Sequence, residues 1–375
     1  MNIAYAYEYR ADDITVRSGH PYFMLGQLEK RAGVSRLFPL DRRIRAAFAP
    51  RFLLHRLRGR TYHPDREPFL LKSFATQVES RLADADVLFS PSSTATCFVD
   101  AGLPKVFSAD ATFANVVEAY DEYRNCAATY LRQAHAQEAR ALATCAAAVY
   151  PSHFAARSAI EDYGADPAKV HVLPYGANIS VPSLHAVEAA IASRALDPLR
   201  VLFVGREWHR KGGDIVVAAC EVARRRGQRL TLDIVGIGTV PQELPAFARS
   251  HGPLRKSDPA QSRRLEWLLA ESDLLFMPSR VENYGIAFSE AAAYGIPSLS
   301  CAVGGIPTVV RAGMSGYLLP PDSPPEAYAD VLSDCVSDRA RYVALCRSAR
   351  RFHDRELAWD RFGENLIEIL NAARR

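Results

Sequence analysis

Short apolar runs recur along the chain and are separated by longer amphipathic stretches. The short runs end at glycine, proline or small polar residues and predict buried strands; they cover residues 2–7, 86–90, 105–109, 147–152, 170–178, 200–205, 230–236 and 273–278. Apolar positions with helical spacing predict helices within residues 21–28, 116–148, 215–226, 263–269, 325–355 and 359–369. Strands that alternate with helices predict an α/β fold with parallel sheets.

The periodicity lapses between residues 180 and 198, which predicts a linker between two domains. A chain of 375 residues is long enough for two domains of ordinary size. We therefore expect two Rossmann-like, doubly wound domains, an N-terminal one over residues 1–180 and a C-terminal one over residues 195–356.

Residues 280–297, Arg-Val-Glu-Asn-Tyr-Gly-Ile-Ala-Phe-Ser-Glu-Ala-Ala-Ala-Tyr-Gly-Ile-Pro, carry two carboxylates close together in the chain. Glu282 follows a predicted strand, and open α/β sheets bind ligands at the carboxyl ends of their strands. A helix is predicted to start near Tyr284 or Gly285. Glu290 would then lie two turns along that helix and about 12 Å from Glu282, roughly the length of a nucleotide-sugar.

The start of this predicted helix is a second binding feature. The first N–H groups of a helix have no partner within it, so those of Tyr284, Gly285 and Ile286 would face a phosphate or a sugar oxygen. On spacing alone, a solvated loop carboxylate at Glu282 and an ordinary helix residue at Glu290 would be the commoner arrangement. The flanking sequence changes that balance.

The C-terminal half carries a family resemblance in three pieces. Residues 280–297 resemble the donor-site motif of the retaining glycosyltransferases of family 4. The segments Gly304-Gly-Ile-Pro-Thr-Val-Val310 and Gly313-Met-Ser-Gly-Tyr-Leu-Leu-Pro320 are similar to its continuation, in the same order. The resemblance implies the glycosyltransferase B fold, in which two Rossmann-like domains face each other across a cleft. In that fold a last helix, here residues 357–375, returns to the N-terminal domain.

The segment Arg206-Glu-Trp-His-Arg-Lys-Gly-Gly-Asp214 follows the strand predicted at 200–205. Its spacing is not that of a Walker loop, and the sequence contains no Gly-x-Gly-x-x-Gly fingerprint, which disfavours a nicotinamide-dependent dehydrogenase. The segment resembles the family's arginine and lysine before a glycine turn. By that resemblance Arg206 and Lys211 hold the donor diphosphate, where fixed cations stabilise the charge of a leaving group. Taken in isolation, two solvated loop cations would be the simpler interpretation.

The resemblance also assigns the two carboxylates. Glu290 would bind the ribose hydroxyls of the donor, since a carboxylate can accept hydrogen bonds from two vicinal hydroxyls, and Glu282 would bind hydroxyls of the donor sugar. Leu254 lies in the segment where relatives contact the base through backbone groups.

Two further candidates lie in the N-terminal domain, where the resemblance is weakest. Gly19 resembles the loop that approaches the donor diphosphate; an ordinary strand-to-helix turn explains it equally well. Asp110 stands where the family usually has a His-Asp or similar polar pair facing the sugar, and this sequence has no histidine there. Asp110 as a helix N-cap is the alternative.

Residues 42–66 are rich in arginine, with apolar residues interleaved; the arginines are Arg42, Arg43, Arg45, Arg51, Arg56, Arg58, Arg60 and Arg66. A basic amphipathic segment can contact anionic lipid headgroups at a membrane surface. It can also line a groove for an anionic or lipid-linked acceptor, and a solvated helix face is the commonest explanation of a charge run. No recognition motif accompanies the charge, so nucleic acid is not an expected partner.

Composition narrows the class of protein. Hydrophobic residues make up 49% of the chain, charged residues 23%, and the net charge is +4, values typical of a soluble globular protein. The seven cysteines lack the spacing of a zinc site or a disulfide framework, and no apolar run approaches the ~20 residues of a membrane span. We expect a cytoplasmic protein, with the inner face of the membrane as the alternative location.

The expected function follows from the resemblance. It implies retaining transfer of a sugar from a UDP- or GDP-sugar to an acceptor hydroxyl, with no metal and no cofactor, in polysaccharide, glycolipid or other glycoconjugate synthesis. The acceptor could be a carbohydrate, a lipid-linked molecule or a small molecule. No nucleophile is placed by the sequence, so the two-carboxylate scheme of glycoside hydrolases is not expected. A non-catalytic sugar-nucleotide-binding protein and a sugar-nucleotide epimerase of the same architecture are the alternatives.

Overall fold

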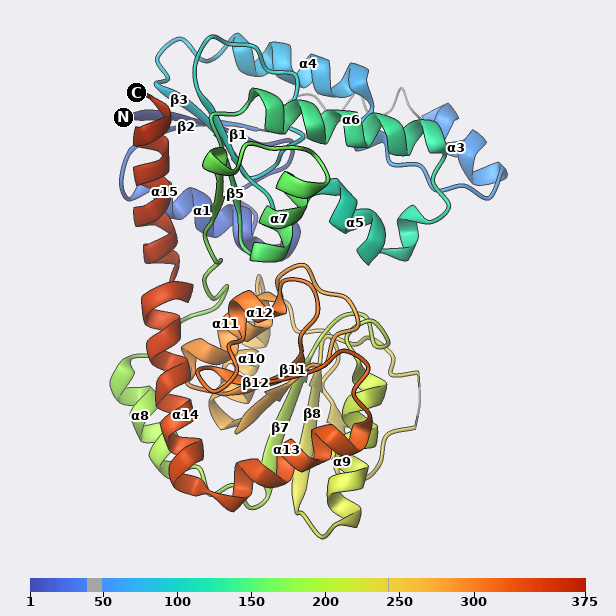
Figure 1. The fold of residues 1–375 in the computed structure, drawn as a ribbon, viewed down its shortest axis with the longest axis vertical. Coiled ribbons are helices and arrows are strands. Elements are labelled where there is room, and N and C mark those ends of the chain that lie inside the picture. Colours follow the sequence, from blue (N-terminus) through green and yellow to red (C-terminus); the bar gives the residue numbers. More distant parts are fainter. Residues whose placement is uncertain (39–48, 242) are drawn as a thin grey trace. The chain divides into compact units, whose positions relative to one another are not determined.

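The computed structural model describes residues 1–38, 49–241 and 243–375, and the chain divides into two compact units (Figure 1). Unit 1 consists of Met1–Pro174 together with Phe362–Arg375, and unit 2 of Tyr175–Arg361. Each unit contains one six-stranded sheet in which neighbouring strands are parallel. Arg42, Arg43 and Arg45 of the basic segment lie outside the described residues, as does the Arg51 side chain.

The sheet of unit 1 has the strand order β2-β1-β3-β4-β5-β6. Its strands are β1 (Asn2–Ala6), β2 (Gly33–Leu37), β3 (Val87–Ser90), β4 (Lys105–Ser108), β5 (Ala147–Tyr150) and β6 (Val170–Val172). Its helices are α1 (His20–Glu29), α3 (Ala49–Leu57), α4 (Pro68–Glu79), α5 (Phe113–Ala119), α6 (Ala128–Thr144), α7 (His153–Glu161) and the part of α15 (Trp359–Ala373) from Phe362 onward.

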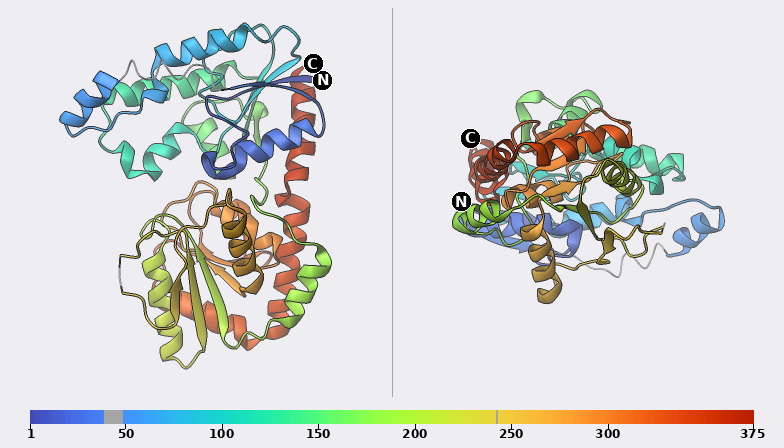
Figure 2. Two further views of the ribbon diagram at one scale, coloured as in Figure 1. Left: turned by 180° about the vertical axis from the view of Figure 1, so that it is seen from behind. Right: turned by 90° about the horizontal axis from the view of Figure 1, so that it is seen from below.

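Alternation along β1 explains why helices cover both faces of this sheet. Ala4 and Ala6 pack into a core with residues of α4, whereas Tyr5 points the other way and donates a hydrogen bond to the Pro21 carbonyl of α1 at 2.9 Å. Helix α1 accordingly lies on the opposite face from α4 and α6, which Figure 2 shows from behind.

The sheet of unit 2 has the strand order β12-β11-β10-β7-β8-β9. Its strands are β7 (Leu199–Val204), β8 (Leu230–Val235), β9 (Ala248–Ser250), β10 (Leu274–Phe276), β11 (Ser298–Cys301) and β12 (Gly316–Leu319). Its helices are α8 (Leu184–Ser193), α9 (Gly213–Arg225), α10 (Pro259–Glu271), α11 (Ile286–Ala293), α12 (Ile306–Val309), α13 (Pro325–Ser337) and α14 (Arg339–Phe352). Helix α9 packs against α13, and α11 packs against α14.

Two expectations about secondary structure are wrong. The predicted linker contains α8, because Ser183 caps the helix by accepting a hydrogen bond from Ala186 N at 3.2 Å and two apolar residues, Val187 and Ile191, are buried. The helix predicted at 116–148 is broken into α5 and α6. The chain turns between them so that the rings of Phe113 and Tyr123 pack edge-on, 5.7 Å apart.

Candidate functional site

Strand order identifies a topological switch point in unit 2. The chain runs from β7 outward to β8 and β9, then crosses to β10 on the other side of β7. Residues 205–212, the β7 loop, and residues 277–285, the β10 loop, therefore leave the carboxyl ends of two adjacent strands in opposite directions. Open α/β sheets bind ligands at this position.

Two glycines allow the polypeptide to pack tightly at this point. Gly212 has a φ of +77°, and a Cβ there would collide with the carbonyl oxygen of Pro278 in the β10 loop. Gly304 has a φ of +51°, and a Cβ there would collide with the carbonyl oxygen of Glu282. Both positions need glycine for the backbone angle and for the space. The backbone that carries Glu282 is thus held from two sides.

Lys211 and Glu282, both predicted from the sequence as site residues, meet at the switch point. Lys211 Nζ forms an ion pair with Oε2 of Glu282, and their side chains are only 13% and 9% exposed. A shielded ion pair is stable only while each charge keeps a partner. An anionic ligand that reaches Lys211 could take the place of Glu282 as that partner.

Glu290 also pairs with a lysine. It lies on α11 with a 3% exposed side chain, and its Oε1 forms an ion pair with Nζ of Lys256 from the loop after β9. Lys256 was not among the residues predicted from the sequence. The signal that could have found it is its place after a strand, since all carboxyl ends of a parallel sheet lie at one edge.

Helix α11 begins within one residue of the predicted start, but it does not extend back to Glu282. Its first residue is Ile286, and Gly285 is the N-cap with a φ of +90°. Glu290 is therefore little more than one turn into the helix, and the span of eight helical residues expected from Glu282 is wrong because residues 282–285 are not helical. Tyr284 is buried and its hydroxyl donates to the carbonyl of Tyr175 at 2.7 Å, which anchors the loop before the helix.

The remaining candidates of unit 2 lie on neighbouring loops. Arg206 is in the β7 loop with an exposed side chain, so it shares the loop of Lys211. Leu254 is half-buried in the loop after β9, two residues from Lys256. The structure thus brings five of the predicted positions to one edge of the sheet, and their roles stay predictions.

Unit 1 has a switch point of its own between β1 and β3, because β2 and β3 lie on opposite sides of β1. The loop after β1 ends at Gly19, which has a φ of +92° and is the N-cap of α1. Arg17 and Ser18 also have positive φ values, +44° and +58°, and such backbone strain is concentrated at functional sites. Gly19 therefore ends a strained loop.

Asp110 is half-buried just after β4. The alternative of an N-cap is wrong for Asp110, since Thr112 caps α5. Asp110 consequently remains a candidate for contact with a sugar.

The unit 1 switch point contains a carboxylate that the sequence did not single out. Glu8 Oε1 accepts hydrogen bonds from Ser92 Oγ at 2.7 Å and from Thr94 Oγ1, and its second oxygen is buried without a partner among the described residues. Nearby, Ser93 Oγ donates to Glu138 Oε2 at 2.7 Å, and burial raises the pKa of Glu138. The run of hydroxyl residues directly after a predicted strand was the available signal.

Several negative observations apply to the part of the chain that the structure describes. Within it, no group of three or more His, Cys, Asp or Glu residues is arranged to hold a metal ion. Helices with the length and apolarity needed to cross a membrane were not found among the same residues.

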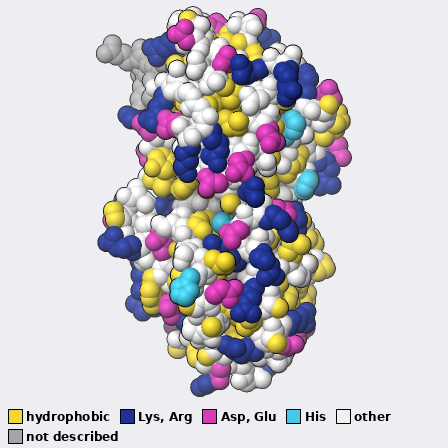
Figure 3. Space-filling model, turned by 90° about the vertical axis from the view of Figure 1, so that its left-hand side faces the viewer, with side chains coloured by type: hydrophobic (Ala, Val, Ile, Leu, Met, Phe, Trp, Pro, Cys, Tyr) yellow, Lys and Arg dark blue, Asp and Glu magenta, His cyan; other side chains and the backbone are white. Residues whose placement is uncertain are grey.

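On the face drawn in Figure 3, Lys and Arg side chains are interspersed with Asp and Glu side chains.

Sequence comparisons identify relatives of part of the chain. Residues 188–352 match the family model described as glycosyl transferases group 1. The D-inositol 3-phosphate glycosyltransferase of Xylanimonas cellulosilytica is 31% identical over 245 residues, which cover 62% of this chain and 58% of that protein. The enzyme of the same name from Actinosynnema mirum is 32% identical over 226 residues, covering 56% and 54%. The chain thus matches little more than half the length of these curated relatives.

Comparison of structures covers nearly the whole chain. The crystal structure of Anabaena Alr3699/HepE in complex with UDP has a TM-score of 0.67 at 17% identity, over 99% of both chains. The sucrose-phosphate synthase (tll1590) of Thermosynechococcus elongatus has a TM-score of 0.69 at 16% identity, over 99% of this chain and 98% of that one. At such identities the likeness shows the fold. Together with the two parallel sheets it confirms the predicted class, two Rossmann-like α/β units.

Proposed function

We propose that this protein transfers a sugar from a nucleotide-sugar to an acceptor hydroxyl, and the match of residues 188–352 to the glycosyl transferases group 1 supports the proposal. The observation that carries the proposal is the pair of shielded lysine–carboxylate contacts at the unit 2 switch point, Lys211 with Glu282 and Lys256 with Glu290. Two cations and two carboxylates at the carboxyl ends of parallel strands suit a ligand that carries both phosphates and hydroxyls.

The ion pairs suggest how the donor enters. Oxygens of the diphosphate would bind Lys211, with Arg206 from the same loop, and Glu282 would be released to accept hydrogen bonds from hydroxyls of the sugar. Glu290 would bind the ribose hydroxyls. The N-terminus of α11, which begins at Ile286 after Tyr284 and Gly285, adds its partial positive charge.

Sugar transfer breaks the bond between the anomeric carbon and the diphosphate oxygen and forms a bond from that carbon to the acceptor oxygen. The electron pair of the broken bond goes to the diphosphate, whose growing charge Lys211 and Arg206 would stabilise. The acceptor proton goes to the leaving phosphate oxygen, on the same face of the sugar, so the anomeric configuration is retained. This scheme needs no metal or cofactor, because the protein's own cations compensate the charge. Proton NMR of the first product formed reads the configuration directly.

The donor proposal is tested by thermal unfolding with UDP, GDP and their common sugar conjugates, followed by product analysis. A ligand at one hundred times its Kd stabilises the folded state by about 2.7 kcal/mol, which a melting curve resolves. Stabilisation by one nucleoside diphosphate and turnover of its sugar conjugate support the proposal and name the base. Stabilisation without turnover would favour the non-catalytic alternative. A product sugar that is inverted at one stereocentre, or that is released without attachment to an acceptor, would favour an epimerase. No stabilisation by any of these ligands would contradict the donor site.

We further propose that the protein contacts the cytoplasmic face of a membrane through helix α3, where a lipid-linked acceptor would be presented. Four large apolar side chains of this helix are 45–77% exposed, namely Phe52, Leu53, Leu54 and Leu57. Arg56, Arg58 and Arg60 are exposed beside them, and residues 49–60 contain no acidic residue. An exposed apolar and basic surface binds anionic lipid through both kinds of contact.

Co-sedimentation with vesicles tests this contact. Vesicles of phosphatidylglycerol and phosphatidylcholine should carry down the protein, and vesicles of phosphatidylcholine alone should carry down much less. The double variant Leu53→Glu, Leu57→Glu should lose binding, while Leu184→Glu, a change of a leucine on α8 of unit 2 that is 55% exposed, should retain it. Equal sedimentation of all three proteins would contradict a membrane contact through α3.

A further inference from the structure

Two arginines cross between the β7 loop and the β10 loop in opposite directions. From the β10 loop, Arg280 donates to the carbonyl of His209 at 2.5 Å and forms a bidentate ion pair with Asp214 in the first turn of α9, at 2.8 and 2.7 Å. From the β7 loop, Arg210 donates to the carbonyl of Val281 at 3.1 Å. We call these contacts, with the backbone bond from Arg280 N to Arg210 O at 2.8 Å, the loop clamp.

The loop clamp surrounds the ion pair at the switch point. Arg280 lies two residues before Glu282, and Asp214 lies three residues after Lys211. Arg210, the neighbour of Lys211, is itself fixed by a bidentate pair with Glu207, at 2.8 and 2.7 Å. A guanidinium bound by two parallel hydrogen bonds holds its partner in one orientation, which a single-point contact does not. The clamp therefore fixes the backbone on both sides of the Lys211–Glu282 pair.

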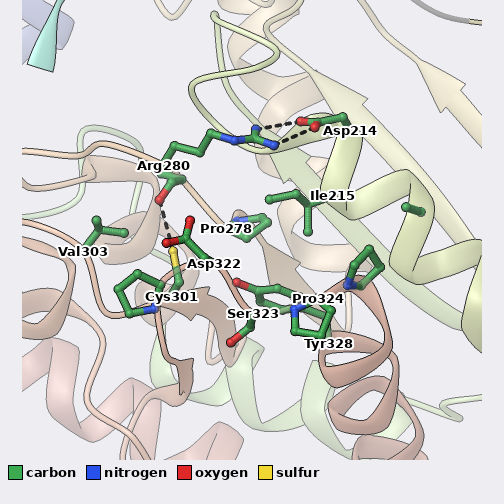
Figure 4. Close-up of a pocket in the computed structure, with 14 residues that line it drawn as sticks. Asp214, Ile215, Pro278, Arg280, Cys301, Val303, Asp322, Ser323, Pro324 and Tyr328 are labelled. Carbon is green, nitrogen blue, oxygen red and sulfur yellow. Dashed lines mark hydrogen bonds and ion pairs between the residues drawn. The ribbon is translucent and has the colours of Figure 1, made fainter.

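A cavity of ≈ 490 Å³ adjoins the Arg280–Asp214 pair (Figure 4). In Figure 4 the guanidinium of Arg280 lies opposite the Asp214 carboxylate at one side of the cavity, and Pro278, Cys301 and Tyr328 line other parts of its wall. The side chains of Arg280 and Asp214 are 34% and 37% exposed, so solutes can reach them. Burial acts to raise the pKa of Asp214, but the hydrogen bonds and charge of Arg280 outweigh it and the pKa lies below its ordinary value.

We propose that Arg280 and Asp214, assisted by Arg210, are positioning residues for sugar transfer: they lock the β7 loop to the β10 loop so that Lys211 and Glu282 meet the donor together. The inference rests on the proposed function. Arg280 and Asp214 act through the backbone, and the groups that would touch the donor are Lys211 and Glu282. A loosened clamp leaves both groups in the protein but no longer aligned.

Removal of Arg280 tests the clamp. Arg280→Ala should lower kcat on the order of 10²-fold, the effect of a misplacement of about 1 Å. The affinity for UDP should change far less, because Lys211 can contact the diphosphate without being aligned with Glu282. The kcat of Arg280→Lys should lie between those of the unaltered protein and Arg280→Ala, since an ammonium group keeps the charge but cannot form the bidentate pair. The double variant Arg280→Ala, Asp214→Ala should be no slower than Arg280→Ala alone, because the effects of two substitutions that break the same contact do not add.

The cavity next to Asp214 allows a second test, rescue of kcat by free guanidinium, which would not be expected if Arg280 served only the stability of the fold. Free guanidinium at millimolar concentration, too dilute to unfold the protein, should enter next to Asp214 and restore part of the lost kcat of Arg280→Ala. It should leave the double variant unchanged. The control is Arg229→Ala, which removes another bidentate arginine–aspartate pair of unit 2, with Asp197 at 2.7 and 2.7 Å, at the opposite edge of the sheet. Its turnover should equal that of the unaltered protein.

The outcomes separate the clamp from the proposed function. Suppose that the unaltered protein transfers sugar. If Arg280→Ala then has the same kcat as Arg229→Ala, or if guanidinium does not raise the kcat of Arg280→Ala, the proposed role of the loop clamp is wrong and the proposed function stands. If the unaltered protein transfers no sugar, the function fails, and amide hydrogen exchange decides the clamp alone. Exchange in residues 205–214 and 277–283 should then be faster in Arg280→Ala than in Arg229→Ala, and equal rates would overturn the proposal.

Discussion

The two units have the same kind of switch point but hold their carboxylates differently. In unit 1, between β1 and β3, Glu8 is held by the hydroxyls of Ser92 and Thr94. In unit 2, between β7 and β10, Glu282 is held by the ammonium group of Lys211. The backbone topology is shared, so the difference lies in the side chains that the loops carry.

This difference changes what the carboxylate at each edge can offer a ligand. Glu8 is held by neutral hydroxyl donors, and the charge of Arg17 in the loop after β1 also acts on it. A carboxylate with hydroxyl partners suits the hydroxyls of a ligand. Lysine partners cancel the charges of Glu282 and Glu290 and can be drawn to an anion instead. We therefore propose that the diphosphate binds to unit 2, and we expect unit 1 to bind a hydroxyl-rich group.

The largest expected effect comes from removing the cation of unit 2. Lys211→Ala should cost about 2–4 kcal/mol of transition-state stabilisation, the scale of one lost charge-stabilising donor, and kcat/KM for sugar transfer measures it. Glu282 also loses its partner, so thermal unfolding should be followed in parallel to separate lost catalysis from lost stability. An unchanged rate would remove Lys211 from the site.

Glu290→Ala should act mainly on donor binding. A hydrogen bond to a charged group is worth about 1.5–3 kcal/mol, and its loss should appear in the KM for the donor with kcat largely retained. Glu290→Gln keeps the shape and one acceptor oxygen, so it should lie between the two. A spared KM together with an abolished kcat would show that the ribose assignment is wrong.

The sequence predicted the fold well because buried parallel strands are continuous apolar runs between turn residues. It also placed Glu282, Glu290 and Lys211 at one edge, since Lys211 and Glu282 lie in loops that follow such strands and Glu290 is on the helix after the second loop. The start of α11 was predicted to within one residue, but the eight-residue helical span from Glu282 was wrong because residues 282–285 form a loop that ends at Gly285, whose φ of +90° the sequence does not show.

The partners of these residues were harder to predict. Lys256 meets Glu290 across 34 residues, after β9, a three-residue strand with one half-buried and two exposed positions and no clear periodicity. Glu8 meets Ser92 and Thr94 across more than 80 residues, a contact that depends on β1 and β3 being neighbours. Such pairs are set by strand order, which local patterns do not encode.

The edge of unit 1 also contains a buried histidine, and this sharpens the comparison through pH. Burial, and secondly the charge of Arg17, lower the pKa of His20 to about 3. In the unfolded chain His20 takes up a proton below its ordinary pKa of about 6.5, whereas in the folded chain it stays neutral down to about pH 3. The free energy of unfolding therefore falls as the pH falls from about 6.5 to about 3, by up to about 1.4 kcal/mol per pH unit.

Chemical unfolding at a series of pH values from 7 to 5 measures this slope. His20→Gln should reduce it by His20's share, and His185→Gln, a change of an exposed histidine on α8, should not. Identical slopes for the unaltered protein and His20→Gln would show that His20 is not held neutral in the folded state.

The smallest expected effect tests whether hydroxyls hold the unit 1 carboxylate. Thr94→Val keeps the shape of a buried side chain but removes one of the two donors to Glu8. Because Ser92 still donates, the cost in urea unfolding should be about 1.5 kcal/mol, the lower end for a hydrogen bond to a charged group. The affinity for UDP should not change, because the lysines and carboxylates assigned to the donor belong to unit 2. A loss of UDP affinity in Thr94→Val would mean that Glu8 belongs to the donor site, and the division of labour between the two edges would be wrong.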